Sequence, residues 1–351
     1  MNKVLSGSNL DVRELEELIL TPGVSGYEEK IREKIAEKLK GILEPDKILV
    51  DSIGNLIVKV GRGRRRIALI AHMDELGLIV TKIERDGRIA FRKMGGINDQ
   101  TLIGTQWEIL TEKGRVNGVI GIKPPHLMLG EPSKILPWHQ LRIDIGVESR
   151  EEAEKLGVKI LDPIVYKKTV LRLANNQISA RSLDDRFGCF ALLETLRKRI
   201  DDLKRDDENE VYFIWSVQEE IGLKGARVIA NTLRPNITFA VDSFPCCSTL
   251  TGDVMVGRGP VVRAIDRSSI SSRDLVRFIQ KISEENEIPL QIGATGGGND
   301  GSVCQERGSK LAVIGVPMKY SHSLVETISL NDLEKLIELL QKILERIREY
   351  P

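Results

Sequence analysis

The alternation of predicted helices and strands in this chain is interrupted once, and that interruption most constrains the possible fold. Before about residue 76, apolar spacing predicts a helix and then three short strands, over 27–42, 47–51, 55–60 and 67–71. After about residue 170 the alternation returns, at 185–200, 211–216, 224 onward, 237–241, 272–284, 289–292 and 311–314. Alternating elements of this kind favour a mostly parallel sheet covered by helices.

The stretch between these two parts has a different pattern. Short segments of alternating apolar and polar residues are separated by Gly and Pro, at 79–83, 89–92, 107–111 and 115–122. Such a pattern is typical of an all-β region. We therefore predict an α/β fold with a mostly parallel central sheet, formed by a main domain of residues 1–76 and 170–351. A small all-β, β-barrel-like domain is inserted at 77–169.

Two helix starts are indicated by their residue types. Ser329 and Asp332 stand at the start of the last helix, whose apolar residues recur at helical spacing to the C-terminus. Ser25 and Glu28 have capping-box spacing before the first predicted helix. We expect these side chains to accept hydrogen bonds from the unpaired N–H groups of each first turn.

Composition and charge exclude several classes of protein. The 351 residues include 52 basic and 51 acidic side chains, so no electrostatic footprint for nucleic acid is present overall. No stretch approaches the roughly 18 uninterrupted apolar residues that span a bilayer. The first residues lack the apolar run of a signal peptide, and the four cysteines form no Cys-x-x-Cys pair. We expect a cytoplasmic protein with neither nucleic-acid nor membrane partners.

A histidine stands at the end of the most apolar predicted strand. The run 67–71 is followed by His72-Met-Asp74, and open α/β sheets build their sites at the carboxyl ends of strands. If the strand geometry continues, His72 and Asp74 point to the same side, so Asp74 can accept a hydrogen bond from the imidazole and fix its tautomer for metal binding. Taken alone, His72 is better explained as a buried structural histidine, by about two to one.

Acidic residues occupy three further element boundaries. They are Asp184 and Asp185 before a helix, Glu219 and Glu220 after one strand, and Asp242 at the end of another. Taken singly, the first pair could cap its helix and the second could lie in a solvated turn. Their occurrence together with His72 at the boundaries around one sheet favours a functional site.

A second imidazole completes the candidate set, because His322 follows the strand predicted at 311–314. Two imidazoles with several carboxylates suit zinc or cobalt better than calcium or magnesium, which prefer oxygen ligands. The candidate ligands are His72, Asp184, Glu220, Asp242 and His322. Their three carboxylates and one hydroxide would balance two divalent cations, and Glu219 would be left as a base beside the metal-bound water.

Six motifs in sequence order make the chain resemble the tetrahedral-type (TET) metallo-aminopeptidases of metallopeptidase family forty-two, which include glutamyl and deblocking aminopeptidases. The motifs are 71–77, 118–121 with 123–126, 183–186, 218–222, 241–242 and 322–326. This resemblance covers nearly the whole chain. It implies a two-zinc exopeptidase fold in which the main domain is catalytic. It also implies that the domain at 77–169 makes dimer contacts within a hollow homododecamer.

The resemblance also implies a role for each site residue. Asp184 would bridge the two ions, with a cis peptide bond to Asp185. The remaining ligands would be His72 and Asp242 on one ion, and Glu220 and His322 on the other. Glu219 would be the general base on a metal-bridging water, and Asp74 would orient His72. Asp185 and Asp300 would lie behind the ligands. The implied reaction removes N-terminal residues from short peptides with a free N-terminus.

Two residues depart from the family pattern. Asn299 stands where Thr is more common, and Lys319 stands where Arg is usual. Because Lys does not reproduce the bidentate contacts of a guanidinium, the preferred N-terminal residue is not carried over from the resemblance.

Three other functions remain as alternatives. A metal-dependent deacylase of small N-acyl amino acids could use the same ligands. A carbohydrase could use paired carboxylates, although an aromatic content of 4% provides few stacking platforms for sugars. An inactive scaffold would be expected to have lost at least one ligand, and here all are present. The glycine-rich run 296–298 lacks the Gly-Lys-Ser/Thr sequence of a phosphate loop.

Overall fold

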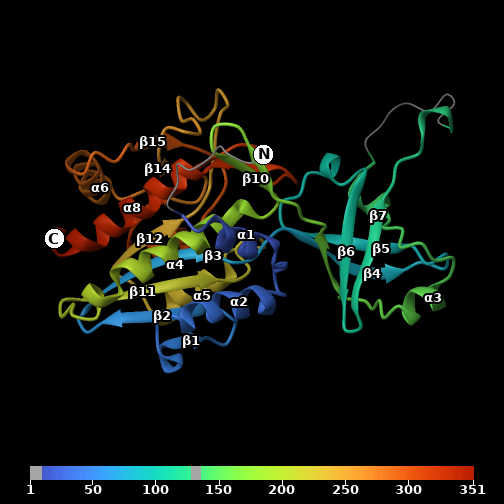
Figure 1. The fold of residues 1–351 in the computed structure, drawn as a ribbon, viewed down its shortest axis with the longest axis horizontal. Coiled ribbons are helices and arrows are strands. Elements are labelled where there is room, and N and C mark those ends of the chain that lie inside the picture. The colour runs from blue at the N-terminus through green and yellow to red at the C-terminus, as the bar shows by residue number, and fades with distance from the viewer. Residues whose placement is uncertain (1–9, 128–135) are drawn as a thin grey trace, which may run out of the picture.

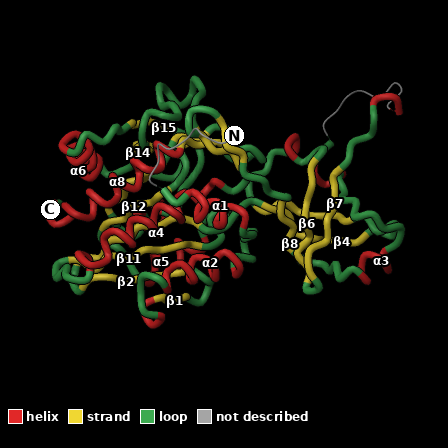
Figure 2. The backbone as a smooth tube through the Cα atoms, in the orientation of Figure 1, coloured by secondary structure: helices red, strands yellow, loops and turns green. Residues whose placement is uncertain are grey.

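The computed structural model describes residues 10–127 and 136–351. Figure 1 shows these residues in two parts of unequal size, a larger one with helices around a sheet and a smaller one made mostly of strands. The same division is visible in Figure 2, where most of the helices lie in the larger part. We call residues 77–166, which contain the sheet of the smaller part, the insert.

The larger part is built on an eight-stranded sheet with the order β1-β2-β11-β3-β12-β16-β14-β15. Its strands are β1 (Ile48–Val50), β2 (Leu56–Gly61), β3 (Arg65–His72), β11 (Asn209–Ser216), β12 (Ile237–Val241), β14 (Val261–Ile265), β15 (Gln291–Ala294) and β16 (Lys310–Gly315). The four central strands, β11, β3, β12 and β16, run parallel. The predicted α/β fold with a mostly parallel central sheet is therefore confirmed.

Helices cover both faces of this sheet. The α-helices outside the insert are α1 (Val12–Leu20), α2 (Glu29–Lys40), α4 (Leu183–Leu203), α5 (Lys224–Thr232), α6 (Arg273–Glu285), α7 (Gly301–Gln305) and α8 (Leu330–Arg346). Apolar residues of α1, α2, α4, α6 and α8 share one core with the sheet, and those of α5 and α7 share another. With both faces covered, β12 is buried along its whole length, as a continuous apolar strand should be.

The two predicted helix starts have different outcomes. Ser329 caps α8 as expected, because its hydroxyl accepts hydrogen bonds from the backbone N–H groups of Asn331 and Asp332. The capping box before α2 is wrong. Glu28 itself occupies the N-cap position without a side-chain cap, and the Ser25 hydroxyl instead donates to the Asp74 carboxylate at 2.6 Å. A tertiary hydrogen bond has replaced the local one that the spacing suggested.

Two smaller sheets lie beside the large one. The three-stranded sheet has the order β18 (Glu326–Ser329), β10 (Gln177–Ala180) and β9 (Leu171–Leu173), and the two-stranded sheet pairs β13 (Phe244–Pro245) with β17 (Pro317–Met318). The sequence did not predict these short strands as elements. They matter for the site because the chain leaves β10 toward Asp184 and connects β17 to β18 through His322.

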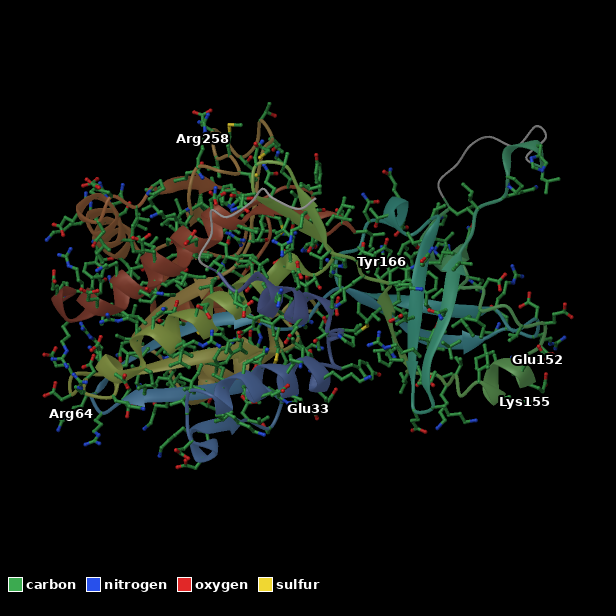
Figure 3. The ribbon with its side chains drawn as sticks, viewed as in Figure 1. Glu33, Arg64, Glu152, Lys155, Tyr166 and Arg258 are labelled. Atoms are coloured by element: carbon green, nitrogen blue, oxygen red, sulfur yellow. The ribbon has the colours of Figure 1, made fainter. Side chains whose placement is uncertain are left out.

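The insert contains a five-stranded antiparallel sheet with the order β5-β4-β8-β6-β7. Its elements are β4 (Gly77–Ile83), β5 (Ile89–Met94), β6 (Thr105–Thr111), β7 (Gly114–Ile120), α3 (Arg150–Lys155) and β8 (Pro163–Tyr166). The short helix α3 and the 3-10 helices Asp99–Thr101, Pro125–Leu127 and Trp138–Gln140 differ from the predicted all-β pattern. In Figure 3 the α3 residues Glu152 and Lys155 lie at the outer end of the insert, far from the larger part.

The insert has its own hydrophobic core. Trp107 is 1% exposed and packs with buried residues of β4, β5 and β8, separately from the cores of the larger part. The indole N–H of Trp107 donates to the hydroxyl of Thr105 at 2.6 Å, so its buried polar atom is satisfied. Within residues 10–127 and 136–351, no helix is long and apolar enough to cross a membrane.

Candidate metal centre

Three neighbouring parallel strands bring four of the predicted site residues together. His72 is the last residue of β3, Asp242 directly follows β12, and Glu219 with Glu220 follows β11 by a short turn. Because β11 and β12 flank β3 in parallel, their carboxyl ends meet at one edge of the sheet. The placement of these residues agrees with the expectation from their positions in the sequence.

Asp184 and His322 reach the same edge from outside the large sheet. Asp184 follows β10 and has non-helical backbone angles (φ −77°, ψ 106°) at the start of α4, and its peptide bond to Asp185 is cis. His322 lies in the turn between β17 and β18, with a left-handed φ of 60°. Sequence reasoning had placed it after the strand that became β16, so its route to the site was not predicted.

All the predicted ligands and the predicted base line one cavity of about 320 Å³. These residues are His72, Asp184, Glu219, Glu220, Asp242 and His322. Arg263 and the glycine-rich run 296–298 also line the cavity. The two other histidines, His126 and His139, do not line the cavity.

Asp184 lies between the two imidazoles and uses a different oxygen for each. Its Oδ1 atom is 3.4 Å from His72 Nε2, and its Oδ2 atom is 3.9 Å from His322 Nε2. His322 Nε2 is also 3.6 Å from Glu220 Oε2. A carboxylate between two imidazoles is the arrangement expected of a group that bridges two ions.

The donor atoms fit a divalent metal. His72, Asp184 and Asp242 offer ligand atoms that all lie within 4.8 Å of one another, and so do His72, Glu219 and Glu220. Among the described residues, Asp184 Oδ1 and Glu220 Oε1 are buried and have no hydrogen-bond partner. A buried carboxylate oxygen without a partner is costly to stability, and a bound cation would provide one. The second group contains Glu219, so these distances alone do not separate its role as a base from that of a ligand.

Burial perturbs the acids that line the cavity. It raises the pKa of Glu220 to about 7 and that of Glu219 well above its usual range. Burial also raises the pKa of Asp242 to about 6, although the guanidinium of Arg263, 3.4 Å away, acts against it. Acidic groups crowded in a low-dielectric cavity resist ionisation, and a divalent cation would favour their charged forms.

The first imidazole responds in the opposite sense. Burial alone would lower the pKa of His72, but its contacts with Asp184 and Asp74 raise that pKa well above the usual value. For Asp184 burial acts in the other direction and would raise the pKa, but the nearby imidazoles of His72 and His322 hold that pKa below its usual value. Without a cation, the imidazoles balance part of the negative charge of the cavity.

Asp74 lies behind His72 and makes more contacts than predicted. His72 Nδ1 is 3.2 Å from the backbone oxygen of Asp74 and 3.5 Å from its carboxylate Oδ1. The same carboxylate accepts hydrogen bonds from the backbone N–H groups of Glu219 at 3.0 Å and Glu220 at 3.2 Å. Asp74 therefore connects the imidazole at the end of β3 to the two acidic residues that follow β11.

Asp185 and Asp300 are buried beneath the cavity and do not line it. Asp185 accepts a hydrogen bond from the backbone N–H of Gly188 at 3.1 Å, and Asp300 accepts one from the hydroxyl of Ser216. Asn299, where the family more often has Thr, is fully buried and donates to Asp266 and Ser269. Asn299 directly precedes Asp300 in the chain.

The sequence analysis did not predict two residues, Glu326 and Arg263, that contact the candidate ligands. The carboxylate of Glu326 accepts a hydrogen bond from the backbone N–H of Asp184 at 3.1 Å and pairs with buried Arg181. Arg263, on β14, pairs with Asp242. Glu326 lies within a motif that carried the family resemblance, so that motif was a signal for it. Arg263 stands alone in an apolar strand, and nothing in its local pattern indicated a role.

The insert also contributes to the cavity, through Gly96. A Cβ atom at Gly96 would lie 3.0 Å from His322 Nδ1, and one at Gly95 would lie 3.2 Å from Glu220 Cβ. The loop after β5 therefore packs directly against two of the candidate ligands. A side chain at Gly95 would also meet Leu76 Cδ2 at 2.0 Å, and one at Gly96 would press on the His322 ring, so glycine favours the close approach.

Comparison with known proteins identifies the family. Residues 54–339 match the family described as M42 glutamyl aminopeptidase. The chain belongs to this family. The resemblance drawn from its motifs is thereby confirmed, and the chain is a member of a family of peptide-hydrolysing enzymes, the M42 aminopeptidases.

Several known proteins are similar to this M42 chain over nearly its whole length. It is 33% identical over 344 residues to the lysyl aminopeptidase of Pyrococcus furiosus, covering 95% of this chain and 96% of that one. The solved structure of the Pyrococcus horikoshii TET1 peptidase, described as assembling into a tetrahedron or a large octahedral shell, has a TM-score of 0.90 and 50% identity, covering 95% and 98%. A PhTET1 structure described as a dodecamer has a TM-score of 0.89 and 49% identity, covering 95% and 99%.

Proposed function

We propose that this M42 chain is a dinuclear metal-dependent aminopeptidase that removes N-terminal residues from short peptides. The observation that carries the proposal is the single cavity in which two imidazoles and four carboxylates gather at the edge of the large sheet. Names of the relatives support peptide hydrolysis, since they include a lysyl aminopeptidase. Buried carboxylate oxygens without hydrogen-bond partners support the dependence on a metal.

Five residues would hold the two ions, zinc or cobalt. His72 and Asp242 would bind one ion, Glu220 and His322 the other, and Asp184 both. The ions would supply the Lewis acidity that polarises the scissile carbonyl and acidifies a water molecule. Asp74 would orient His72 from behind through the contacts described above, since an imidazole held at its second nitrogen presents a fixed tautomer to a metal.

Glu219 would act as the general base. It lines the cavity beside Glu220 but is not needed to complete the ligand set. Its carboxylate would take a proton from the attacking water and deliver that proton to the amine that leaves when the peptide bond breaks. Burial raises the pKa of Glu219, which favours a group that both accepts and returns a proton.

We also propose that residues 77–169 form a dimerisation domain and that residues 1–76 and 170–351 form the catalytic domain. Dimers would assemble into a homododecamer. Support comes from the separate core of the insert and from the solved relatives described as a dodecamer and as a tetrahedron. Light scattering of the purified protein tests this assembly, and a stable monomer would refute it.

A panel of short peptides tests the activity. Initial rates are measured for free-amine peptides and their N-acetylated counterparts, before chelation, after EDTA, and after zinc or cobalt is returned. We expect cleavage of the free-amine peptides alone, lost with EDTA and restored by metal. Equal or faster turnover of the acetylated substrates would instead support the deacylase.

A further inference from the structure

The turn that carries Glu219 and Glu220 is held by side chains from distant parts of the chain. Four consecutive backbone N–H groups, from residue 217 to residue 220, each donate to a side-chain oxygen of the N-terminal region. The acceptors are Asn55 Oδ1 for Val217 (3.0 Å), Glu28 Oε1 for Gln218 (3.1 Å), Asp74 Oδ1 for Glu219 (3.0 Å) and Asp74 Oδ2 for Glu220 (3.2 Å). No regular secondary structure supplies these partners.

The backbone of this turn needs such support. Gln218, directly before the proposed base, has a φ of 56°. This left-handed region is unfavourable for residues other than glycine, so Gln218 would relax from it unless its surroundings held it there. Relaxation would rotate the next peptide and move the Glu219 side chain within the cavity.

The carbonyl side of the turn is already tied to the start of α5. Val217 O accepts from Gly225 N, and Gln218 O accepts from Lys224 N. These bonds join residues that are neighbours in sequence and would move together with the turn. The N–H side joins residues 217–220 to side chains of the N-terminal region, and so it helps to fix their position relative to His72 on β3.

Glu28 is the member of this set that stands at the start of α2, where it is the N-cap residue. It is 3% exposed and forms no ion pair within the described part of the chain. Its Oε1 atom accepts from Gly26 N at 2.7 Å and from Gln218 N. A buried carboxyl group without a basic partner usually costs stability, so a role in the site accounts for it better than a role in folding.

We infer that Glu28, assisted by Asn55, is a positioning residue that holds Gln218 in its left-handed conformation and so aims Glu219 into the cavity. The inference rests on the proposed aminopeptidase function for its kinetic consequence. Its structural consequence, a turn held in place by the Glu28 carboxyl oxygen, is measurable without activity.

Glu28→Ala and Glu28→Gln test the inference, with exposed Glu29→Ala as the matched control. In Glu28→Ala we expect kcat on a free-amine peptide to fall by about 10-fold to 100-fold, because small misplacements of catalytic groups cost that much. KM and metal content should change little. Glu28→Gln should keep most of the activity, because the amide oxygen still accepts the Gln218 N–H. Glu29→Ala should behave as the unaltered protein.

Hydrogen exchange measured by mass spectrometry provides the readout independent of activity. Amides of the peptide that contains residues 217–220 should exchange faster in Glu28→Ala and not in Glu29→Ala. Adding Gln218→Gly should restore part of kcat, because glycine adopts the left-handed conformation without strain. If Glu28→Ala does not fold, Asn55→Ala tests the same turn through Val217 and should also speed exchange there.

Specific outcomes would overturn the inference. They are unaltered exchange at 217–220 in Glu28→Ala, unaltered kcat in that variant, or a Glu28→Gln variant as impaired as Glu28→Ala. The last would show that charge, and not hydrogen bonding, is what Glu28 contributes. Failure of the unaltered protein to cleave any peptide would count against the proposed function, and the exchange data would still decide whether Glu28 holds the turn.

Discussion

The large sheet and the insert accommodate polar residues differently. From Ile67 to His72, β3 is buried, because helices cover both faces of the sheet. In the insert, β6 and β7 alternate between more buried and more exposed residues. Polar side chains can therefore lie along the open face of an insert strand, whereas the charged side chains and the histidine of the four central strands stand at or next to a strand end. This confinement explains why the candidate ligands gather at one edge of the large sheet.

The larger part and the insert both line the cavity, but they contribute different groups to it. The larger part supplies every imidazole and carboxylate that lines it, and the insert supplies the backbone of Gly96. The larger part thus supplies the side chains that could bind metal or move a proton, and the insert supplies only a part of the cavity wall. Substitutions made in pairs, one in each region, should separate these two contributions.

Loss of a proposed metal ligand should have the largest effect. Asp184→Ala or His322→Ala removes a donor from the cavity, so metal content and peptide cleavage should both fall toward background. His139→Ala removes an imidazole from the insert and should change neither. Elemental analysis of the purified proteins measures the metal. Full occupancy in both ligand variants would contradict the ligand set.

Loss of the proposed base should be nearly as severe while the metal stays bound. Glu219→Gln removes the group that moves the proton, and this should lower kcat by about 10² to 10⁴. Glu84→Gln, an acid of the insert, should leave the rate unaltered. Initial rates at saturating peptide, with metal content determined on the same samples, provide the measurement. Near-normal turnover by Glu219→Gln would show that another group is the base.

A methyl group on the insert side of the cavity should have an intermediate effect. Gly96→Ala places a Cβ atom 3.0 Å from His322 Nδ1, so the imidazole must shift. We expect kcat to fall by roughly tenfold or more, since a small displacement of a ligand disturbs the reacting geometry. Gly121→Ala, with open space around its Cβ position, is the matched control. Equal rates for the two variants would show that the insert does not influence the geometry of the active site.

The smallest effect should come from helix caps. Ser329 caps α8 through two N–H groups and is buried, whereas Ser149 caps α3 through one and is partly exposed. Ser329→Ala should reduce the free energy of unfolding by about 1 to 2 kcal/mol and Ser149→Ala by about 0.5 kcal/mol. Urea unfolding followed by circular dichroism compares them. The reverse order would show that the short helix contributes more to stability than its length suggests.

Much of the fold was predictable from the sequence for a local reason. Apolar spacing distinguishes a helix from a strand over ten or so residues, and β12, α6 and α8 each appear close to their predicted ranges. The short strands β10, β13, β17 and β18 were not predicted, because two to four residues carry too little periodicity. Ser25 shows the limit most clearly. Its spacing from Glu28 suggested a cap, but its hydroxyl bonds to Asp74, a residue 49 positions away.

For the site, the sequence by itself determined which residues were available: His72 and Asp242 at strand ends, acids at other boundaries, and a second imidazole at residue 322. Residue type and position at an element boundary are local properties, so they can be read from the chain. Only the tertiary structure decided by which segments these residues reach the cavity and which other residues hold them there. Asp184 and His322 arrive beside the smaller sheets, Gly96 arrives from the insert, and Glu28 holds the turn before Glu219. These arrangements depend on contacts between segments far apart in sequence, and no local pattern records such contacts.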